Sequence, residues 1–128
     1  MTPLQRMQTV DTQLAHVWMV RAFLKHSDEA ADDEELASVH RELYDYMLAL
    51  GAPLQQGDAE TYLKTARKKL AKLKRATDQF RRIQPDISQH TNFKMAAASL
   101  SAAVAELERL LAANDAEHLT QSRGDVSE

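Results

Sequence analysis

The chain of 128 residues contains no cysteine, only three glycines and three prolines, and few aromatic residues. Without cysteine it can form no disulfide and hold no metal through a thiolate, which agrees with a reducing compartment. Scarce glycine and proline, together with abundant alanine, leucine, lysine, glutamate and glutamine, favour long helices. The composition therefore indicates an all-α protein.

The chain also lacks a long apolar run and a leader-like start. Its most apolar stretch is short and is interrupted by Arg21, so we expect no transmembrane segment. Residues 1–13 contain no basic stretch followed by an apolar run, so we expect no signal peptide and a cytoplasmic location. A formal net charge of −3 argues against a general nucleic-acid binder.

Apolar residues recur at steps of three and four in four segments, at about residues 3–26, 32–50, 58–83 and 88–113. The first begins with a capping sequence at Thr2, Pro3 and Gln5, the second is predicted to stop at Gly51 with Pro53 behind it, and the third to stop before Pro85. Short connections favour antiparallel neighbours. The sequence thus predicts an antiparallel up-down four-helix bundle over residues 1–114, and a polar, disordered tail at 115–128. A helical hairpin that dimerises into a bundle is the alternative.

The first segment differs from the others because LAHVWMVRAFL, ending at Leu24, is apolar nearly all round. Such a helix is either enclosed by neighbours or shares a second face with another subunit. Trp18 and Met19 lie off the main apolar stripe, so they are the candidate interface residues. Packing beneath a flanking helix is the alternative for both side chains.

Two polar residues interrupt the apolar stripes, Arg21 in the first segment and His40 in the second. Polar groups at such positions need partners or a route to water. A carboxylate such as Glu34 or Glu42 is the expected partner of Arg21. The structural interpretation is a polar layer inside the bundle, or an arginine whose guanidinium reaches out of the bundle to water, and the alternative is a ligand-binding role.

One end of the predicted bundle collects His26, Glu29, Asp86 and His90 from two turns. Imidazole and carboxylate ligands suit zinc or a similar divalent ion, and this set is the candidate metal site. No other cofactor is expected. The alternative is that Asp86 caps the last helix and His90 is a half-exposed end residue.

Charge is segregated along the chain. Six acids lie between Asp28 and Glu35, whereas nine basic residues and one acid lie between Lys64 and Arg82. The candidate basic face consists of Lys64, Arg67, Lys68, Lys72, Lys74 and Arg75. Such a face could follow a phosphate backbone, or it could be a solvated surface whose arginines pair with the acidic segment.

Two short patterns resemble known families. The spacing of Arg21 and His26 resembles that of HEPN-type ribonucleases, although Ala22 stands where those enzymes usually have a polar residue. Glu34-Glu35 with Glu42 and Asp45 loosely resembles the acidic motifs of all-α nucleotide pyrophosphohydrolases, but Ser38 replaces one carboxylate. We assign the chain to no family.

No nucleophile stands beside a base and no glycine-rich phosphate loop is present, which favours a binding protein over an enzyme. The function we expect is a protein-interaction or assembly module whose partner is another protein or a second copy. A metal-dependent or HEPN-like hydrolase using the His26 and His90 end is the first alternative. Nucleic-acid phosphate binding by residues 58–83 is the second.

Overall fold

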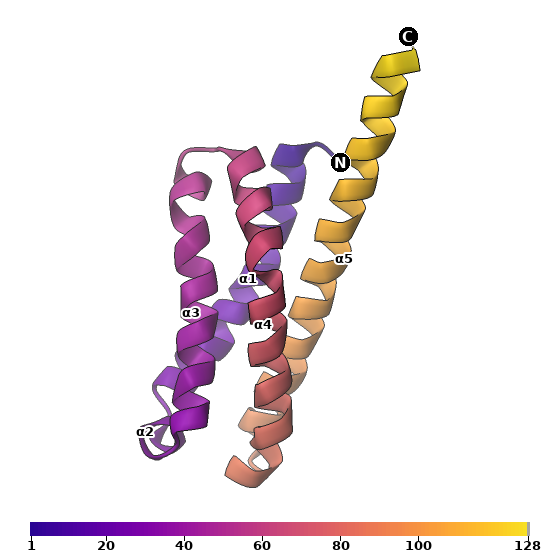
Figure 1. Ribbon diagram of the computed structural model, residues 1–128. Coiled ribbons are helices and arrows are strands. Elements are labelled where there is room, and N and C mark those ends of the chain that lie inside the picture. The colour runs from indigo at the N-terminus through magenta and orange to yellow at the C-terminus, as the bar shows by residue number, and fades with distance from the viewer. Residues whose placement is uncertain (128) are drawn as a thin grey trace.

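The computed structural model describes the backbone of residues 1–127 and the side chains of residues 1–112. The described residues are helical almost throughout and contain no strand, which confirms the all-α class. The helices are α1 (Pro3–Lys25), α2 (Asp28–Asp32), α3 (Glu34–Gln55), α4 (Ala59–Ile87) and α5 (Thr91–Ser127). Figure 1 shows the four long helices side by side, each running opposite to the long helix before it. The polar tail predicted at 115–128 falls on side chains outside the described residues, and it stays a prediction.

The start of α1 follows the predicted capping pattern. The Thr2 hydroxyl accepts a hydrogen bond from the Gln5 N–H at 3.1 Å, and the Gln5 side chain accepts one from the Thr2 N–H at 2.9 Å. Pro3 occupies the first helical position, where its missing N–H costs no helical bond. These local contacts alone determine where α1 begins.

The acidic segment forms two helices where one start near Asp32 was predicted. Ser27 caps the short α2 by accepting from the Ala30 N–H, and Asp33 caps α3 by accepting from the Leu36 N–H at 2.9 Å. Asp33 is extended, with φ −126° and ψ 111°, so the helix cannot run through it. The prediction was wrong because two good capping residues lie six positions apart, and each begins its own helix.

The predicted stop of the second helix at Gly51 is also wrong. Helix α3 continues through Gly51 and the buried Pro53 to Gln55. Its last turn is closed by hydrogen bonds from the Gly57 N–H to the Leu54 carbonyl and from the Asp58 N–H to the Pro53 carbonyl. Gly57 has φ +65°, so it is the glycine that ends the helix. Proline near a helix end removes only one hydrogen bond, which the added turn and its burial offset.

The end of α4 and the start of α5 also differ from the predicted positions. Helix α4 passes through Pro85 to Ile87, and the Gln84 side chain donates to the Ser88 carbonyl at 2.8 Å beyond its last turn. Helix α5 starts at Thr91, because the His90 ring Nδ1 accepts from the Asn92 N–H at 3.0 Å. A histidine thus takes the capping position that the sequence suggested for residues 86–88.

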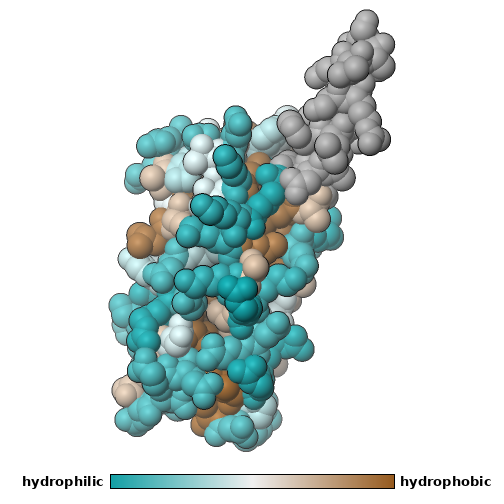
Figure 2. Space-filling model, viewed as in Figure 1, coloured by the Kyte–Doolittle hydropathy of each residue, from teal (hydrophilic) through white to brown (hydrophobic). Residues whose placement is uncertain are grey.

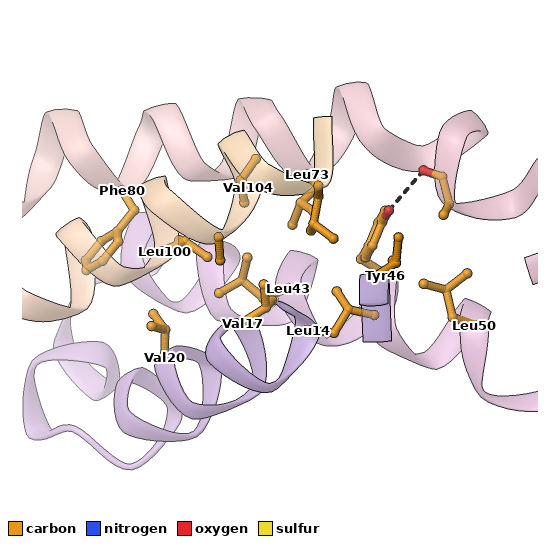
Figure 3. Close-up of a cluster of buried hydrophobic side chains, with 14 of the residues drawn as sticks. Leu14, Val17, Val20, Leu43, Tyr46, Leu50, Leu73, Phe80, Leu100 and Val104 are labelled. Atoms are coloured by element: carbon orange, nitrogen blue, oxygen red, sulfur yellow. Dashed lines mark hydrogen bonds between the residues drawn. The ribbon is translucent and has the colours of Figure 1, made fainter. Parts of the chain in front are cut away.

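The apolar stripes of the four long helices meet in one core, seen in Figure 3. Val17, Leu43 and Leu100 illustrate it, since each is fully or almost fully buried. The Tyr46 hydroxyl donates to the Ala66 carbonyl at 2.9 Å and so joins α3 to α4 within the core. Helix α1 contacts α3 on one side and α5 on the other, and it contacts α4 less extensively. Among the described residues, α1 also exposes a row of side chains between Leu4 and Met19 to solvent.

None of the helices in the described residues combines the length and hydrophobicity that a bilayer span requires.

Candidate functional site

Arg21 lies between two aromatic rings contributed by α1 and α3. Its guanidinium carbon is 4.8 Å from the centre of the Trp18 ring and 4.7 Å from the centre of the Tyr44 ring. Trp18 and Arg21 are three residues apart and therefore lie on one face of α1. A cation over an aromatic face is attracted by the ring quadrupole. The stack orders the guanidinium at the surface where α1 meets α3.

The carboxylate partners expected for Arg21 are engaged elsewhere. Glu34 pairs with Arg41 at 2.6 Å, within α3. Glu42 pairs with Lys72 of α4 at 3.4 Å. The expected ion pair is therefore wrong, because Glu34 and Glu42 pair with other cations and the Arg21 guanidinium stacks on the Trp18 and Tyr44 rings.

A surface hollow of about 340 Å³ adjoins the stack and contains His40, the second predicted polar residue. We call it the His40 hollow. Its lining residues are Arg21, Lys25, Ser38, His40, Arg41, Glu42, Tyr44 and Asp45. Arg21 and Lys25 are four residues apart on α1, and His40 and Tyr44 are four residues apart on α3, so each pair lies on one face of its helix.

The electrostatics of the His40 hollow are dominated by positive charge around the imidazole. Burial lowers the pKa of His40 most, and the nearby charges of Arg41, Arg21 and Lys25 lower it further. Both causes disfavour the imidazolium form. The neutral ring can donate from one nitrogen and accept at the other.

The outer side of α1 forms a second feature. Among the residues that the structure describes, no exposed position of α1 between Leu4 and Met19 is Asp, Glu, Lys or Arg. Asp11, the acid in this stretch, is half-buried and accepts a hydrogen bond from the Tyr62 hydroxyl at 3.1 Å. We define the α1 outer face as Leu4, Gln8, Thr12, Ala15, Trp18 and Met19. Trp18 is 43% exposed and Met19 is 67% exposed, so neither packs beneath a flanking helix.

The candidate metal residues come near one another without forming a ligand set. His26, Glu29 and His90 line one open hollow of about 400 Å³, and Asp86 lines a neighbouring one with Glu29. The Nδ1 of His90 already accepts a hydrogen bond, so in the neutral ring its Nε2 carries the proton and acts as a donor. Within the described side chains, no three histidine or acidic groups are placed to hold one metal ion.

The arginine and histidine of the HEPN-like spacing also diverge. Arg21 lines the His40 hollow, whereas His26 lines the hollow that contains His90. The two residues therefore do not face a common site.

The basic residues of α4 divide into two groups. Lys72, Lys74 and Arg81 form ion pairs with Glu42, Glu108 and Asp78, and the Nε of Arg67 donates to the Leu111 carbonyl at 3.3 Å. The others make no ion pair among the described residues, and they are Lys64, Lys68, Lys69, Arg75 and Arg82. Figure 2 shows the face formed by α3 and α4 as largely hydrophilic. The acidic segment does not neutralise Arg81, which pairs within its own helix.

Sequence reasoning missed Lys25, Arg41 and Tyr44 as members of the site. The steps of three and four that link Trp18, Arg21 and Lys25 were present in the sequence and could have indicated them. It also missed Arg6, which is buried and donates to the Leu110 carbonyl at 2.9 Å.

No protein-family model, no curated protein and no solved structure matches this chain. Function is therefore inferred from its residues and their geometry.

Proposed function

We propose that this protein is an assembly module that self-associates through the α1 outer face, with a second copy of the chain as partner. The supporting observation is the charge-free exposed side of α1, which carries Trp18 and Met19. Depletion of charge at the centre of a surface patch, with enrichment of aromatic residues and methionine, is typical of protein–protein interfaces.

The spacing of the α1 outer face supports helix packing. Leu4, Gln8, Thr12, Ala15 and Met19 follow one another at steps of four, four, three and four. This spacing repeats along one side of a helix and offers a second seam opposite the core. The seam rises about 22 Å along the axis at 1.5 Å per residue, which is long enough for a helix–helix contact. The small Ala15 beside the larger Met19 allows two helices to approach closely.

A second copy is the partner that the charge pattern favours. Across a two-fold axis the same patch meets itself, so any charge on the patch would meet its like. The α1 outer face carries none, and two copies can pair antiparallel without repulsion. A helix from a different protein is the other occupant, and the experiment below separates the two.

Sedimentation equilibrium over a wide range of protein concentration tests the proposal. We expect a reversible monomer–dimer equilibrium that is abolished by Met19→Glu, which places a charge in each half of the interface. The matched control is Met95→Glu, because Met95 lies on α5 and its side chain is 60% exposed, close to the 67% of Met19. A chain that stays monomeric at high concentration overturns self-association, and so does a dimer that Met19→Glu leaves intact.

This proposal includes two finer statements. We interpret the arrangement of α1, α3, α4 and α5 as an antiparallel up-down four-helix bundle that forms one domain. We also retain a cytoplasmic location as an expectation, which imaging of a tagged chain in its native cell would check.

A second candidate function is binding of a nucleic-acid phosphate backbone by α4. The observation that favours it is the set of cations that form no ion pair within residues 1–112, since Lys64, Lys68, Arg75 and Arg82 follow at steps of four, seven and seven on one side of α4. No aromatic ring accompanies them on this side, so we expect binding without base preference.

Titration of a mixed-sequence duplex at several salt concentrations tests this candidate. If four phosphates are neutralised, the logarithm of the affinity falls against the logarithm of salt with a slope of roughly −3.6. Lys68→Glu should weaken binding and reduce the slope, whereas Lys94→Glu, an exposed position on α5, should change neither. Binding that ignores salt would exclude the candidate.

A further inference from the structure

We infer that the His40 hollow is a binding site for a phosphate-type dianion. This site lies on the α3 side of α1, beside the α1 outer face, and the inference does not depend on self-association. It rests on the convergence of donors from two helices, on the balance of charge around them and on a buried N–H of Arg21 that lacks an acceptor among the described residues.

The first argument is the set of donors. Arg21 and Lys25 come from α1, and Ser38 and His40 come from α3, and all four line the same hollow. A tetrahedral oxyanion offers more acceptor oxygens than a carboxylate and can engage several of these donors at once. The stack with Trp18 and Tyr44 holds the Arg21 guanidinium in place before a ligand arrives, so less side-chain entropy is lost on binding.

The second argument is the charge balance of the hollow. Arg41 is already paired with Glu34, and Glu42 is already paired with Lys72. Arg21 and Lys25 then face a single carboxylate without an ion pair among the described residues, that of Asp45. The hollow thus keeps an excess of positive charge, and protonation of His40 increases it.

The third argument is an unsatisfied donor. The Nε–H of Arg21 is shielded from solvent and has no hydrogen-bond acceptor within the part of the chain that the structure describes. Buried donors are nearly always paired, so an orphaned one calls for an acceptor from outside the chain. An anion in the adjacent hollow would supply it once the guanidinium turns to present this N–H to the hollow.

The size of the hollow agrees with a small ligand. At about 340 Å³ it holds an oxyanion and several waters, given that each water takes about 30 Å³ of the liquid. Because the hollow is open to solvent, each charge pair contributes little, and we expect millimolar affinity for a simple anion.

His40 provides a direct test. Its pKa is lowered by burial and by Arg41, Arg21 and Lys25, while Glu42 and Asp45 also line the hollow and oppose those cations. A bound dianion stabilises the imidazolium form, so binding raises the pKa of His40. By linkage, affinity then increases as the pH falls.

The experiment is an NMR titration of the histidine rings with sodium sulfate, with sodium chloride adjusted to keep ionic strength constant. Sulfate stays a dianion across the range in which His40 titrates, so the ligand's own charge does not change. We expect a saturable shift of the His40 resonance and a rise in its pKa of about one unit. His16 and His26 of the same chain are internal controls.

Variants localise the site. Lys25→Gln removes one exposed cation, and we expect about fivefold weaker sulfate binding. His40→Gln, followed through the amides of Ser38 and Arg41, should remove the pH dependence of binding. Lys64→Gln on α4 is the matched control with an exposed lysine outside the hollow. Circular dichroism and urea unfolding verify that each variant is folded.

Two sources of the dianion are distinguished by repeating the titration with inorganic phosphate and with phenyl phosphate. Tighter binding of phenyl phosphate assigns the site to a phosphate monoester whose ring stacks on the partly exposed Tyr44. Equal affinities assign it to the free anion. The inference is overturned if His40 responds to sulfate no more than His16 does, or if Lys25→Gln and Lys64→Gln bind sulfate alike. Sulfate binding with no dimer, or a dimer with no sulfate binding, separates this inference from the proposed function.

Discussion

Two tyrosine hydroxyls connect helices that are distant in sequence. Tyr46 donates to the Ala66 carbonyl of α4, and Tyr62 donates to the Asp11 carboxylate of α1. Burial raises the pKa of both phenols above the ordinary value, and the charge of Asp11 raises that of Tyr62 further. These two directional hydrogen bonds join α3 to α4 and α4 to α1 within a largely apolar core.

Tyr46→Phe should lower the free energy of unfolding by about 1 kcal/mol, because the buried hydrogen bond is lost while the ring still fills its space. Urea unfolding followed by circular dichroism measures this. Tyr44→Phe is the matched control, since Tyr44 is 38% exposed and its hydroxyl makes no hydrogen bond among the described residues. Equal effects of the two variants would mean that the Tyr46 hydrogen bond contributes nothing.

His40 makes stability depend on pH. Because its pKa in the folded chain lies below the ordinary 6.5, the unfolded chain binds a proton that the folded chain does not. This contribution is therefore fully present above pH 6.5 and is lost as the pH falls toward the folded pKa. We expect His40→Gln to lose less stability than the wild type between neutral and mildly acidic pH, measured by urea unfolding in buffers without multivalent anions. His16→Gln, at an exposed position of α1, is the control and should follow the wild type.

Two glycines have different roles in helix α3: Gly57 lies in the turn that ends the helix, and Gly51 lies inside the helix. Gly57 has φ +65° at the turn between α3 and α4, and Gly51 lies inside α3 with nothing within 4 Å of an added Cβ. The sequence pattern favoured Gly51 as the terminal glycine because Pro53 follows it closely. The helix instead spans both residues, since burial of Pro53 and the closing hydrogen bonds at Gly57 outweigh one missing N–H.

We expect the two glycine-to-alanine substitutions to change the free energy of unfolding in opposite directions. Gly57→Ala should destabilise the protein by roughly 1 kcal/mol, because a side chain is strained in the left-handed region. Gly51→Ala should stabilise it by about 0.5 kcal/mol or more, because it reduces the freedom of the unfolded chain at an open helical site. Thermal and urea unfolding of both variants check this. Two changes of the same sign would show that the helix end is assigned to the wrong glycine.

At the scale of the whole molecule, self-association links stability to concentration. A dimer that forms from folded chains stabilises them by mass action, so the Tm should rise with protein concentration. Met19→Glu should remove this dependence, while Met95→Glu should retain it. Differential scanning calorimetry at several concentrations measures both, and a Tm of the wild type that is independent of concentration would contradict the dimer.

Local sequence signals were sufficient for the features that depend on neighbouring residues. The step of three and four residues predicted the helical class, and leucines that follow this step, such as Leu14, Leu43 and Leu100, are buried in the structure. The cap at Thr2 was predicted for the same reason, since both partners lie within one turn. Proline and glycine near helix ends were less reliable signals, because burial of the last turn decides whether a helix continues.

The composition left open which polar side chains lie together, and only the tertiary structure decided this. Whether Arg21 meets a carboxylate or the Tyr44 ring of α3 depends on how α1 and α3 are rotated against each other, and no local sequence pattern indicates that rotation. The same rotation brings Lys25 and His40 to one hollow. The sequence by itself determined long helices with apolar stripes, because their hydrogen bonds and periodicity are local. The packing of these helices selected which polar groups share a surface, because the contacts between helices depend on their mutual register.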